Sequence, residues 1–372
     1  MLFTLKTKSL CRNLLLIFSL SLFFSCQKDL SLEDGGTVVV TPPDLSTKIN
    51  SSVSGFVTDE NDAAVMGASV QFGSSSITTD KYGYFEAKNV QVVKEAAVVT
   101  VIKPGYFKGI KTYMAKEGKA AFFRIKLIPK TTVGNVNAAS GGTVTLANGL
   151  SIKLPSGSIV NAATNAIYTG TVNVAAYWIN PTAADLNQIM PGDLRGINTE
   201  GTLKLLQTFG MAAVELTGAS GELLQIANGQ KATLTLPIPS SLSASAPATI
   251  PLWYFDEVNG LWKQEGSATK TGNTYVGDVS HFSFWNCDVP ANYVQFNKTK
   301  KNSAGNPLPY TMVKITVVGT SNSGWGFTDS SGYVGGAVPA NANLLMEVFA
   351  NYGCTTPVYT QTFTTTNVNI SL

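Results

Sequence analysis

The heptapeptide Thr-Asp-Lys-Tyr-Gly-Tyr-Phe at residues 79–85 decides the fold, because a close variant, Thr-Asp-Ser-Ser-Gly-Tyr-Val, returns at residues 328–334. Each copy follows a short apolar run with the alternation of a strand, Ala-Ser-Val-Gln-Phe at residues 68–72 and Thr-Met-Val-Lys-Ile at residues 311–315. The second copy has six more residues between the run and the heptapeptide, and such length differences belong in loops. The chain therefore contains an internal repeat of strand, hairpin and turn.

Both heptapeptides have Asp three positions before Gly. Asp at the first position of a type I turn accepts hydrogen bonds from the backbone that follows, and Gly at the fourth adopts the positive φ that leads into the next strand. We predict that Asp80 with Gly83, and Asp329 with Gly332, are turn formers. A role of the two Asp residues as metal ligands is the alternative.

The rest of the sequence is typical of antiparallel β-structure. From Val53 onward, short runs of Val, Ile, Thr, Phe and Tyr are separated by Gly, Asn, Asp and Ser. Asn259-Gly260 between two aromatic runs predicts a hairpin. One short helix is predicted over residues 182–190, after Asn180-Pro181 and before Pro191-Gly192. We therefore predict an all-β fold.

The first 25 residues have the three-part layout of a secretory signal. Residues 6–12 carry basic side chains, residues 14–24 are almost wholly apolar, and Ser25-Cys26 follow. The apolar run is too short to span a bilayer. Residues 23–26, Phe-Phe-Ser-Cys, resemble a lipobox, although Phe stands where Leu and a small residue are common. The resemblance implies cleavage after residue 25 and a lipid on Cys26; an ordinary signal peptide with an incidental Cys is the alternative.

Residues 27–29, Gln-Lys-Asp, resemble the short signal that sends lipoproteins of the Bacteroidota to the outer face of the outer membrane. The resemblance implies a chain held on the outer membrane through its lipid and facing the cell exterior, with a periplasm-facing anchor as the alternative. Residues 26–50 mix charges, a Gly pair and Pro42-Pro43, which predicts a flexible, disordered tether.

The charge distribution excludes a nucleic-acid-binding protein. The formal net charge of +3 depends on Lys6, Lys8 and Arg12. Without these three residues the 26 basic residues fall to 23, which equals the number of acidic residues. Charged residues make up 13% of the chain and form no basic cluster beyond residues 298–301, so we expect no nucleic-acid partner.

The first repeat resembles the carboxypeptidase regulatory-like, transthyretin-like domain. The resemblance rests on Gly-Phe-Val at residues 55–57, Gly-Ala-Ser-Val at residues 67–70, the first heptapeptide and Lys-Pro-Gly-Tyr at residues 103–106. It implies a seven-stranded Greek-key sandwich, of the transthyretin or prealbumin type, without catalytic residues. Near the C-terminus the likeness is partial, because the leading Gly and the Lys-Pro-Gly-Tyr element are missing there.

The region between the repeats has other landmarks. They include Leu-Pro-Ser-Gly at residues 154–157, Leu-Trp-Tyr-Phe-Asp at residues 252–256 and His-Phe-Ser-Phe-Trp-Asn at residues 281–286. In their spacing they resemble the extracellular region shared by cartilage intermediate layer proteins and astroprincin. We therefore predict tandem β-sandwich domains, with two transthyretin-like sandwiches on either side of a larger β domain. The predicted boundaries are residues 1–25 (signal), 26–50 (tether), 51–130, 131–290 and 291–372.

His281-Phe282-Ser283 is a candidate self-cleavage site. Relatives of ankyrin-type β domains cut themselves at a His-Phe-Ser sequence, and the resemblance implies Ser283 as nucleophile, His281 as base and a cut after Phe282. If the run is a strand, His281 and Ser283 share one face while Phe282 points into the core. We favour the alternative, in which the pair is structural. His281 is the only His, and no Gly-x-Ser-x-Gly motif occurs, so we do not expect a Ser hydrolase.

Three further groups of residues are candidates for chemistry or binding. Cys287 and Cys354 are the cysteines left after the signal and the anchor, and in an exported protein they predict a disulfide, with two buried free thiols as the alternative. Trp325, in a Gly-rich run that reads as a loop, is a candidate ligand contact. Asp59, Glu60 and Asp62 near a turn are a possible Ca²⁺ site, but we expect solvated turn residues and no cofactor.

These observations predict a non-enzymatic, lipid-anchored surface protein that binds a protein or a glycan or acts as a structural spacer. Two alternatives remain open at this point. One is a self-cleaving surface protein processed between Phe282 and Ser283. The other is an accessory subunit of a nutrient-uptake or secretion complex.

Overall fold

The computed structural model describes residues 42–372, and these residues are almost entirely β-structure. The predicted all-β fold with tandem sandwiches is confirmed. The predicted signal, Cys26 and most of the predicted tether lie outside the described residues. The last tether positions, residues 48–50, are already part of the first strand, because they pair with residues 91–93.

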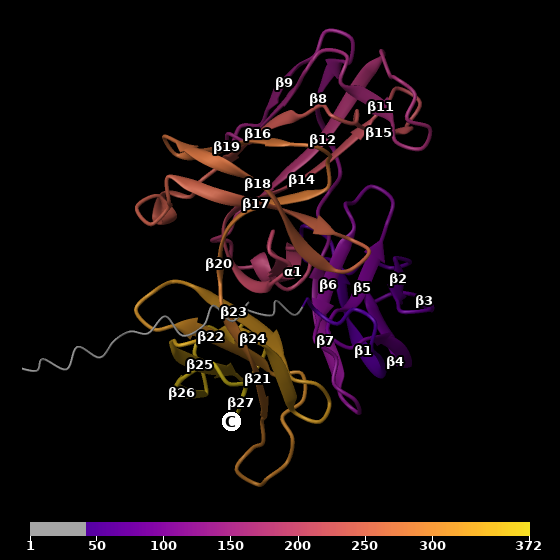
Figure 1. Ribbon diagram of the computed structural model, residues 1–372. Helices are drawn as coiled ribbons and strands as arrows, with labels where there is room; N and C mark the ends of the chain where they lie inside the picture. Colours follow the sequence, from indigo (N-terminus) through magenta and orange to yellow (C-terminus); the bar gives the residue numbers. More distant parts are fainter. Residues whose placement is uncertain (1–41) are drawn as a thin grey trace, which may run out of the picture. The chain divides into compact units, whose positions relative to one another are not determined.

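The first sandwich contains seven strands, drawn in indigo and purple in Figure 1. One sheet has the order β4-β1-β7 and the other the order β3-β2-β5-β6. The central strand β1 is antiparallel to β4 and parallel to β7. The strands are β1 (Lys48–Thr58), β2 (Ser69–Phe72), β3 (Ser75–Thr78), β4 (Tyr84–Val93), β5 (Ala97–Ile102), β6 (Gly109–Tyr113) and β7 (Ala120–Lys126).

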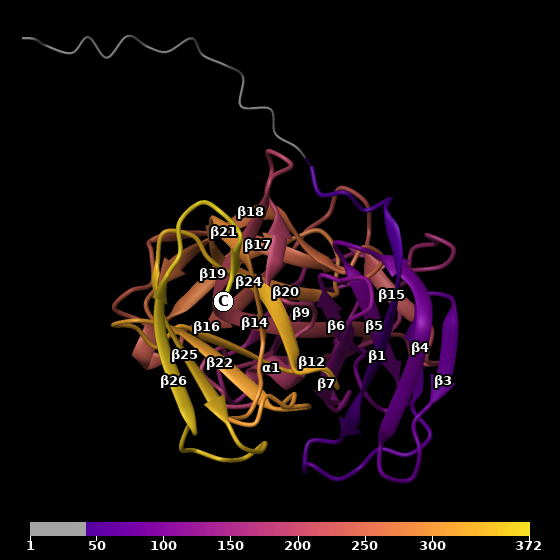
Figure 2. The same cartoon turned by 90° about the horizontal axis from the view of Figure 1, so that it is seen from below.

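The third sandwich repeats this topology strand for strand. Its sheets have the orders β24-β21-β27 and β23-β22-β25-β26, and β21 is antiparallel to β24 and parallel to β27. Figure 2 shows β22, β25 and β26 side by side. The strands are β21 (Tyr293–Thr299), β22 (Met312–Val317), β23 (Ser323–Phe327), β24 (Tyr333–Pro339), β25 (Asn343–Phe349), β26 (Tyr359–Thr364) and β27 (Ile370–Ser371). The internal repeat read from the two heptapeptides is therefore a repeat of the whole sandwich.

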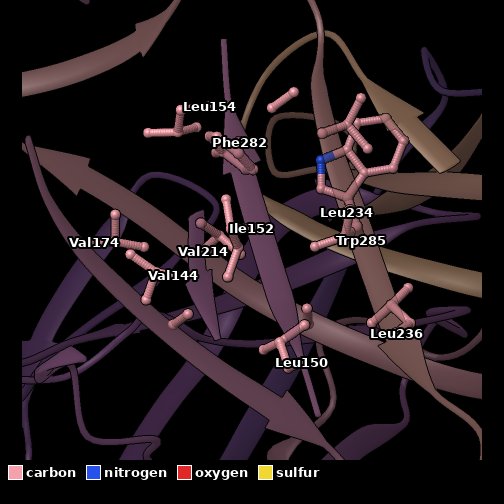
Figure 3. Close-up of a cluster of buried hydrophobic side chains, with 14 of the residues drawn as sticks. Val144, Leu150, Ile152, Leu154, Val174, Val214, Leu234, Leu236, Phe282 and Trp285 are labelled. Atoms are coloured by element: carbon pink, nitrogen blue, oxygen red, sulfur yellow. The ribbon is translucent and has the colours of Figure 1, made fainter. Parts of the chain in front are cut away.

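The middle region forms one sheet of 13 strands around its own core. Figure 3 shows part of that core, where Ile152, Val174 and Trp285 gather with other buried side chains. The strands are β8 (Thr132–Asn137), β9 (Gly142–Thr145), β10 (Ser151–Leu154), β11 (Ile159–Asn161), β12 (Thr171–Ile179), β13 (Arg195–Ile197), β14 (Leu203–Thr217), β15 (Leu223–Ile226), β16 (Ala232–Pro237), β17 (Thr249–Asp256), β18 (Leu261–Thr271), β19 (Thr274–Val279) and β20 (Phe284–Ala291).

The helix predicted over residues 182–190 is shorter than expected. Asn180 accepts the backbone N–H of Thr182 and so starts a turn, but the helix α1 spans only Leu186–Ile189. A side-chain bond of this kind competes with helical backbone bonding, which explains the late start. A 3₁₀ turn at Ser240–Leu242 is the other helical element of the described chain. Neither is long or apolar enough to span a membrane.

The first sandwich and the middle sheet share a core. Phe107, Ile110 and Ile128 of the first sandwich region pack in one buried cluster with Trp253 and Trp262 of the middle sheet. Burial of large aromatic side chains contributes strongly to stability, on the order of 2 kcal/mol each. The first sandwich and the middle sheet are therefore packed against each other and are not independent domains joined by a linker.

The predicted hairpin at Asn259-Gly260 is present, and its tip takes part in this packing. Gly260 joins β17 to β18 with φ of 68°, and its backbone N–H donates to the carbonyl of Asp256 at 2.8 Å. Thr112 of β6 donates its hydroxyl to the Gly260 carbonyl at 2.7 Å. A Cβ at Gly260 would lie 2.3 Å from a methyl carbon of Val98. Only glycine fits this contact between the two parts.

Candidate functional site: a groove between the first and third sandwiches

The duplicated turn has the same local geometry in both sandwiches. The Oδ1 atom of Asp80 accepts the backbone N–H groups of Tyr82 and Tyr84, each at 2.8 Å. Gly83 follows with φ of 73°, and a Cβ there would lie 2.3 Å from the carbonyl oxygen of Val57. The Asp therefore closes the turn, and the Gly allows the chain to pass close to the neighbouring strand.

Asp329 makes the same turn and also joins the two sandwiches. Its Oδ1 atom accepts the N–H groups of Ser331 and Tyr333 at 2.8 and 2.9 Å, and Gly332 has φ of 77°. Its Oδ2 atom accepts the backbone N–H of Ala120, at the start of β7, at 3.2 Å. Asp80 is exposed, whereas Asp329 is 3% exposed. One copy of the turn has thus become a contact between sandwiches.

A groove of about 430 Å³ lies beside this contact. Its walls are residues 50–54 of β1, residues 86, 88 and 89 of β4, the loop and strand start at residues 117–121, and the turn at residues 329–331. Ser, Asn, Glu, Lys and Asp side chains supply most of this lining, so the groove offers both hydrogen-bond donors and acceptors. The sequence alone gave no sign that these segments meet.

Tyr310 is the aromatic side chain among the residues that line the groove. It is 47% exposed, and its ring lies 4.9 Å from the ring of Phe122, measured between centroids. Its backbone has φ of 54°, which is rare for a non-glycine residue, and its N–H donates to the carbonyl of Thr328 at 3.1 Å. Strained backbone of this kind persists when the surroundings fix it, and it is common at ligand sites.

Two lysine side chains, one of which lines the groove, lie beside the Asp329 turn. Lys119 donates its Nζ to the hydroxyl of Ser331 at 3.1 Å. The Nζ atoms of Lys116 and Lys119 also lie 5.3 and 5.4 Å from the ring centroid of Tyr333. Burial raises the pKa of Tyr333, and the Asp329 carboxylate raises it further, so the phenol stays neutral beside the two cations.

An aromatic clamp around Arg124 holds the third sandwich against the rest of the molecule. The guanidinium of Arg124 in β7 lies 4.1 Å from the ring centroid of Tyr352 and 5.7 Å from that of Phe56. The Tyr352 hydroxyl accepts the side-chain amide N–H of Gln188 in α1 at 2.6 Å. Strand β7, the helix and the third sandwich therefore meet at Tyr352.

Trp325 belongs to this contact and not to a loop. It lies within strand β23, and its ring packs on Phe327 and Tyr352 at 5.7 and 6.5 Å between centroids. Its carbonyl oxygen accepts the side-chain amide N–H of Asn187 in α1. The predicted loop setting was wrong because residues 323–326, although Gly-rich, pair with β22. Trp325 is half-buried where the third sandwich meets the middle region, so its surroundings do not favour the ligand-contact interpretation.

His281-Phe282-Ser283 is a bend that precedes β20, not a strand as the hypothesis of a shared face required. The imidazole of His281 packs on Tyr254 and Trp285 at 4.7 and 5.2 Å between ring centroids, and burial lowers its pKa. The Ser283 hydroxyl bonds to the carbonyl of Phe284 at 3.2 Å. Among the described residues no hydrogen bond joins His281 to Ser283, so the geometry does not support self-cleavage.

The predicted disulfide between Cys287 and Cys354 is not formed; both are free thiols. Cys287 is fully buried in the core of the middle sheet, where burial raises the pKa of its thiol. Cys354 is partly exposed and lies in the third sandwich between β25 and β26. The prediction was wrong because strand β20 turns Cys287 into its own core, away from the surface that the other thiol occupies.

The acidic turn at residues 59–62 is built from local hydrogen bonds. The Oδ1 atom of Asp59 accepts the N–H groups of Asn61 and Ala63 at 2.9 and 2.8 Å, and Asp62 pairs with Lys126 at 2.9 Å. Within residues 42–372, no group of three or more His, Cys, Asp or Glu side chains is placed to hold a metal ion. The absence of a cofactor stays a prediction.

The sequence interpretation missed the groove and a buried polar cluster in the middle sheet. Ser52 and Ser54 of β1 line the groove, and no motif in the sequence pointed to them. Asn286 and Asp288 are fully buried in β20, within the run Phe-Trp-Asn-Cys-Asp-Val. Two polar residues two positions apart in so apolar a strand were the signal that could have indicated a buried polar site.

No family model matches the chain. Over 181 residues the chain is 26% identical to human cartilage intermediate layer protein 2, a stretch that covers 44% of this chain and 15% of that protein. The major pilin BcpA of Bacillus cereus aligns with 87% of this chain and 98% of its own at 12% identity and a TM-score of 0.17. A putative carbohydrate-binding protein of Bacteroides uniformis aligns with 63% of this chain and 98% of its own at 9% identity and a TM-score of 0.17. Scores this low carry no inference about fold or function.

Proposed function

We propose that this chain is a non-enzymatic, lipid-anchored surface protein whose docked sandwiches present the inter-sandwich groove to a glycan. The observation that carries the proposal is the contact between Asp329 and Ala120, which fixes the third sandwich beside the first and so builds the groove. A polar lining with one exposed aromatic ring suits a sugar, which binds through hydroxyl hydrogen bonds and through stacking of its apolar face.

A glycan microarray with the purified protein tests this function. Tyr310→Ala removes the aromatic ring from the groove, and we expect a loss of about tenfold in affinity for the retained glycans, since ring stacking contributes about 1–1.5 kcal/mol. Tyr82→Ala is the matched control, because Tyr82 is 63% exposed and lies outside the groove lining. If the wild-type protein retains no glycan on the array, the glycan proposal fails and a spacer or protein-binding role takes its place.

The proposal of a non-enzymatic role is supported by the way the chain's ionisable groups are arranged. The single His packs between aromatic rings. In the groove, Glu86 and Lys88 form an ion pair, and Asp329 is engaged in its turn and in the contact between sandwiches. Turnover chemistry requires a nucleophile or base with a shifted pKa that faces a cleft. Incubation of the protein with the glycans it binds should leave their chain length unchanged, as measured by chromatography.

The lipid anchor and the outward display are proposals that rest on the signal layout and on the resemblance to a lipobox. Labelling of growing cells with palmitate should mark the wild-type protein and not the Cys26→Ala variant. Protease added to intact cells should then degrade the labelled protein if it faces the exterior. Protection until the outer membrane is opened would instead favour the periplasm-facing anchor.

A further inference from the structure

A buried polar trio lies in the middle sheet, away from the groove. Thr208 comes from β14, and Asn286 and Asp288 come from the neighbouring strand β20 (Figure 1). Their side chains are 8%, 0% and 0% exposed. Asn286 and Asp288 are two positions apart in one strand and so share one face of the sheet.

A β-bulge aims Thr208 at Asn286. Thr208 is in register with Asp288, but the next pair along the strands is Gly210 with Cys287, so Phe209 is an extra residue in β14. Bulges of this kind redirect side chains and are common beside functional sites. Here the Thr208 hydroxyl lies 2.7 Å from the Oδ1 atom of Asn286. The backbone N–H of Gly210 donates to the same hydroxyl oxygen at 3.2 Å.

The trio is short of hydrogen bonds. The Nδ2 atom of Asn286 and both carboxyl oxygens of Asp288 are buried and lack a partner of normal geometry. Burial of unpaired polar groups is unfavourable, and each such group in a native protein calls for an explanation. Burial also raises the pKa of Asp288 well above its usual value, although a hydrogen bond with the Thr208 side chain acts in the opposite direction, so the protonated form of this side chain is favoured.

We propose that Thr208 and Asn286 become joined by an intramolecular ester bond, with Asp288 as the acid and base of the reaction. The Oγ1 atom of Thr208 attacks the Cγ atom of Asn286. Asp288 gives its proton to the departing Nδ2 and takes the proton of the hydroxyl. The Cγ–Oγ1 bond forms, the Cγ–Nδ2 bond breaks and one molecule of ammonia leaves, so Asp288 ends as it began and no other reactant is needed.

The arrangement supplies what this reaction requires. Two adjacent strands hold the hydroxyl and the amide in contact, so the entropy cost of bringing the reacting groups together is paid when the protein folds. The carboxyl group is fully buried and its pKa is raised, which favours the protonated form that an acid for an amide leaving group must have. The product also loses the buried Nδ2 group that has no partner. The bond would tie together two central strands whose joined residues are 78 positions apart in the chain.

The mass of the intact, denatured protein tests the proposal. The wild-type chain should be lighter than its sequence mass by one ammonia. Thr208→Val removes the hydroxyl while keeping the shape of the side chain, and Asp288→Asn removes the acid while leaving both bonding partners, so both variants should have the full sequence mass. Thr208→Ser keeps a hydroxyl and should retain the deficit.

Peptide mapping locates the loss. After trypsin, residues 205–231 and 271–298 should appear as one linked species that separates on treatment with hydroxylamine, a reagent that cleaves esters. A wild-type protein of full mass overturns the proposal and leaves a hydrogen-bonded trio. A deficit that maps elsewhere, for example to cyclisation at Asn259-Gly260, overturns it as well. Because the measurement is made in denaturant, a variant that folds poorly still gives an answer.

Discussion

Asp329 and Ala120 are joined by a hydrogen bond of 3.2 Å from the Ala120 N–H to the Oδ2 atom of Asp329, across 209 positions of sequence. Its counterpart Asp80 makes the same turn and is exposed. The same turn therefore makes only local hydrogen bonds in the first sandwich. In the third sandwich it also makes a tertiary hydrogen bond to another sandwich. The difference lies in what faces the second carboxylate oxygen.

The Asp329→Asn variant should weaken the docking of the third sandwich. The amide can still close the turn through its oxygen, but its NH₂ group would face the Ala120 N–H, so a partly buried donor loses its acceptor. We expect a loss of about 1–3 kcal/mol in the free energy of unfolding, measured by urea denaturation. Asp80→Asn should change it by less than about 0.5 kcal/mol. Equal effects of the two variants would contradict the role assigned to Asp329.

The Gly260→Ala variant should separate the tip of the β17–β18 hairpin from the first sandwich. The new methyl group would meet Val98 and Thr112, and φ is positive at this position. We expect destabilisation of roughly 2–4 kcal/mol, from overpacking added to backbone strain. Gly272→Ala is the control, because Gly272 has φ of 61° in the next hairpin and nothing within 4 Å of an added Cβ. It should cost only about 1 kcal/mol.

Limited proteolysis provides the second measurement for Gly260. In the Gly260→Ala variant, cleavage at exposed lysines of the first sandwich should become faster than in the control. Equal stability and equal cleavage of the two variants would show that the hairpin tip does not hold the first sandwich.

Lys111 should make stability depend on pH above neutrality. Its Nζ is buried and donates to the carbonyls of Asn187 and Met190 at 2.8 and 2.7 Å, and burial lowers its pKa from 10.5 to about 7. Between these values the unfolded chain holds a proton that the folded chain lacks. The free energy of unfolding should therefore rise with pH from about 7 to about 10.5, by at most about 1.4 kcal/mol per pH unit.

The Lys111→Met variant isolates this contribution, because every other titrating group is common to both proteins. The difference in free energy of unfolding between wild type and variant should change in favour of the wild type as pH rises through this window. A difference that stays constant with pH would mean that Lys111 keeps its ordinary pKa in the folded protein.

The two thiols should differ sharply in reactivity. In a form of the chain with Cys11 and Cys26 replaced by Ala, a maleimide should label the partly exposed Cys354 without any reductant. Cys287 is fully buried with a raised pKa, so it should react only in denaturant. The Cys354→Ser variant should take up no label while folded. If Cys354 is labelled only after reduction, the predicted disulfide between Cys287 and Cys354 is formed after all.

The sequence predicted those features whose physical cause is local. Asp80 and Asp329 close turns because a carboxylate four residues before a backbone N–H can reach it, and Gly83 and Gly332 follow because only glycine adopts positive φ without strain. Repetition of this local chemistry indicated the duplicated sandwich. The local sequence gave a wrong prediction for Trp325: the Gly-rich run around it predicted a loop, but the run pairs with β22 as a strand.

The tertiary structure alone decided which surfaces meet. The shared core that places Phe107 against Trp253 and Trp262, the contact from Asp329 to Ala120 and the polar trio around Asn286 all join residues far apart in the chain. A turn depends on a few consecutive residues, so the same short sequence pattern marks it in both sandwiches. Docking depends on the shape and polarity of whole faces, to which each residue adds little, so no short stretch of sequence records it.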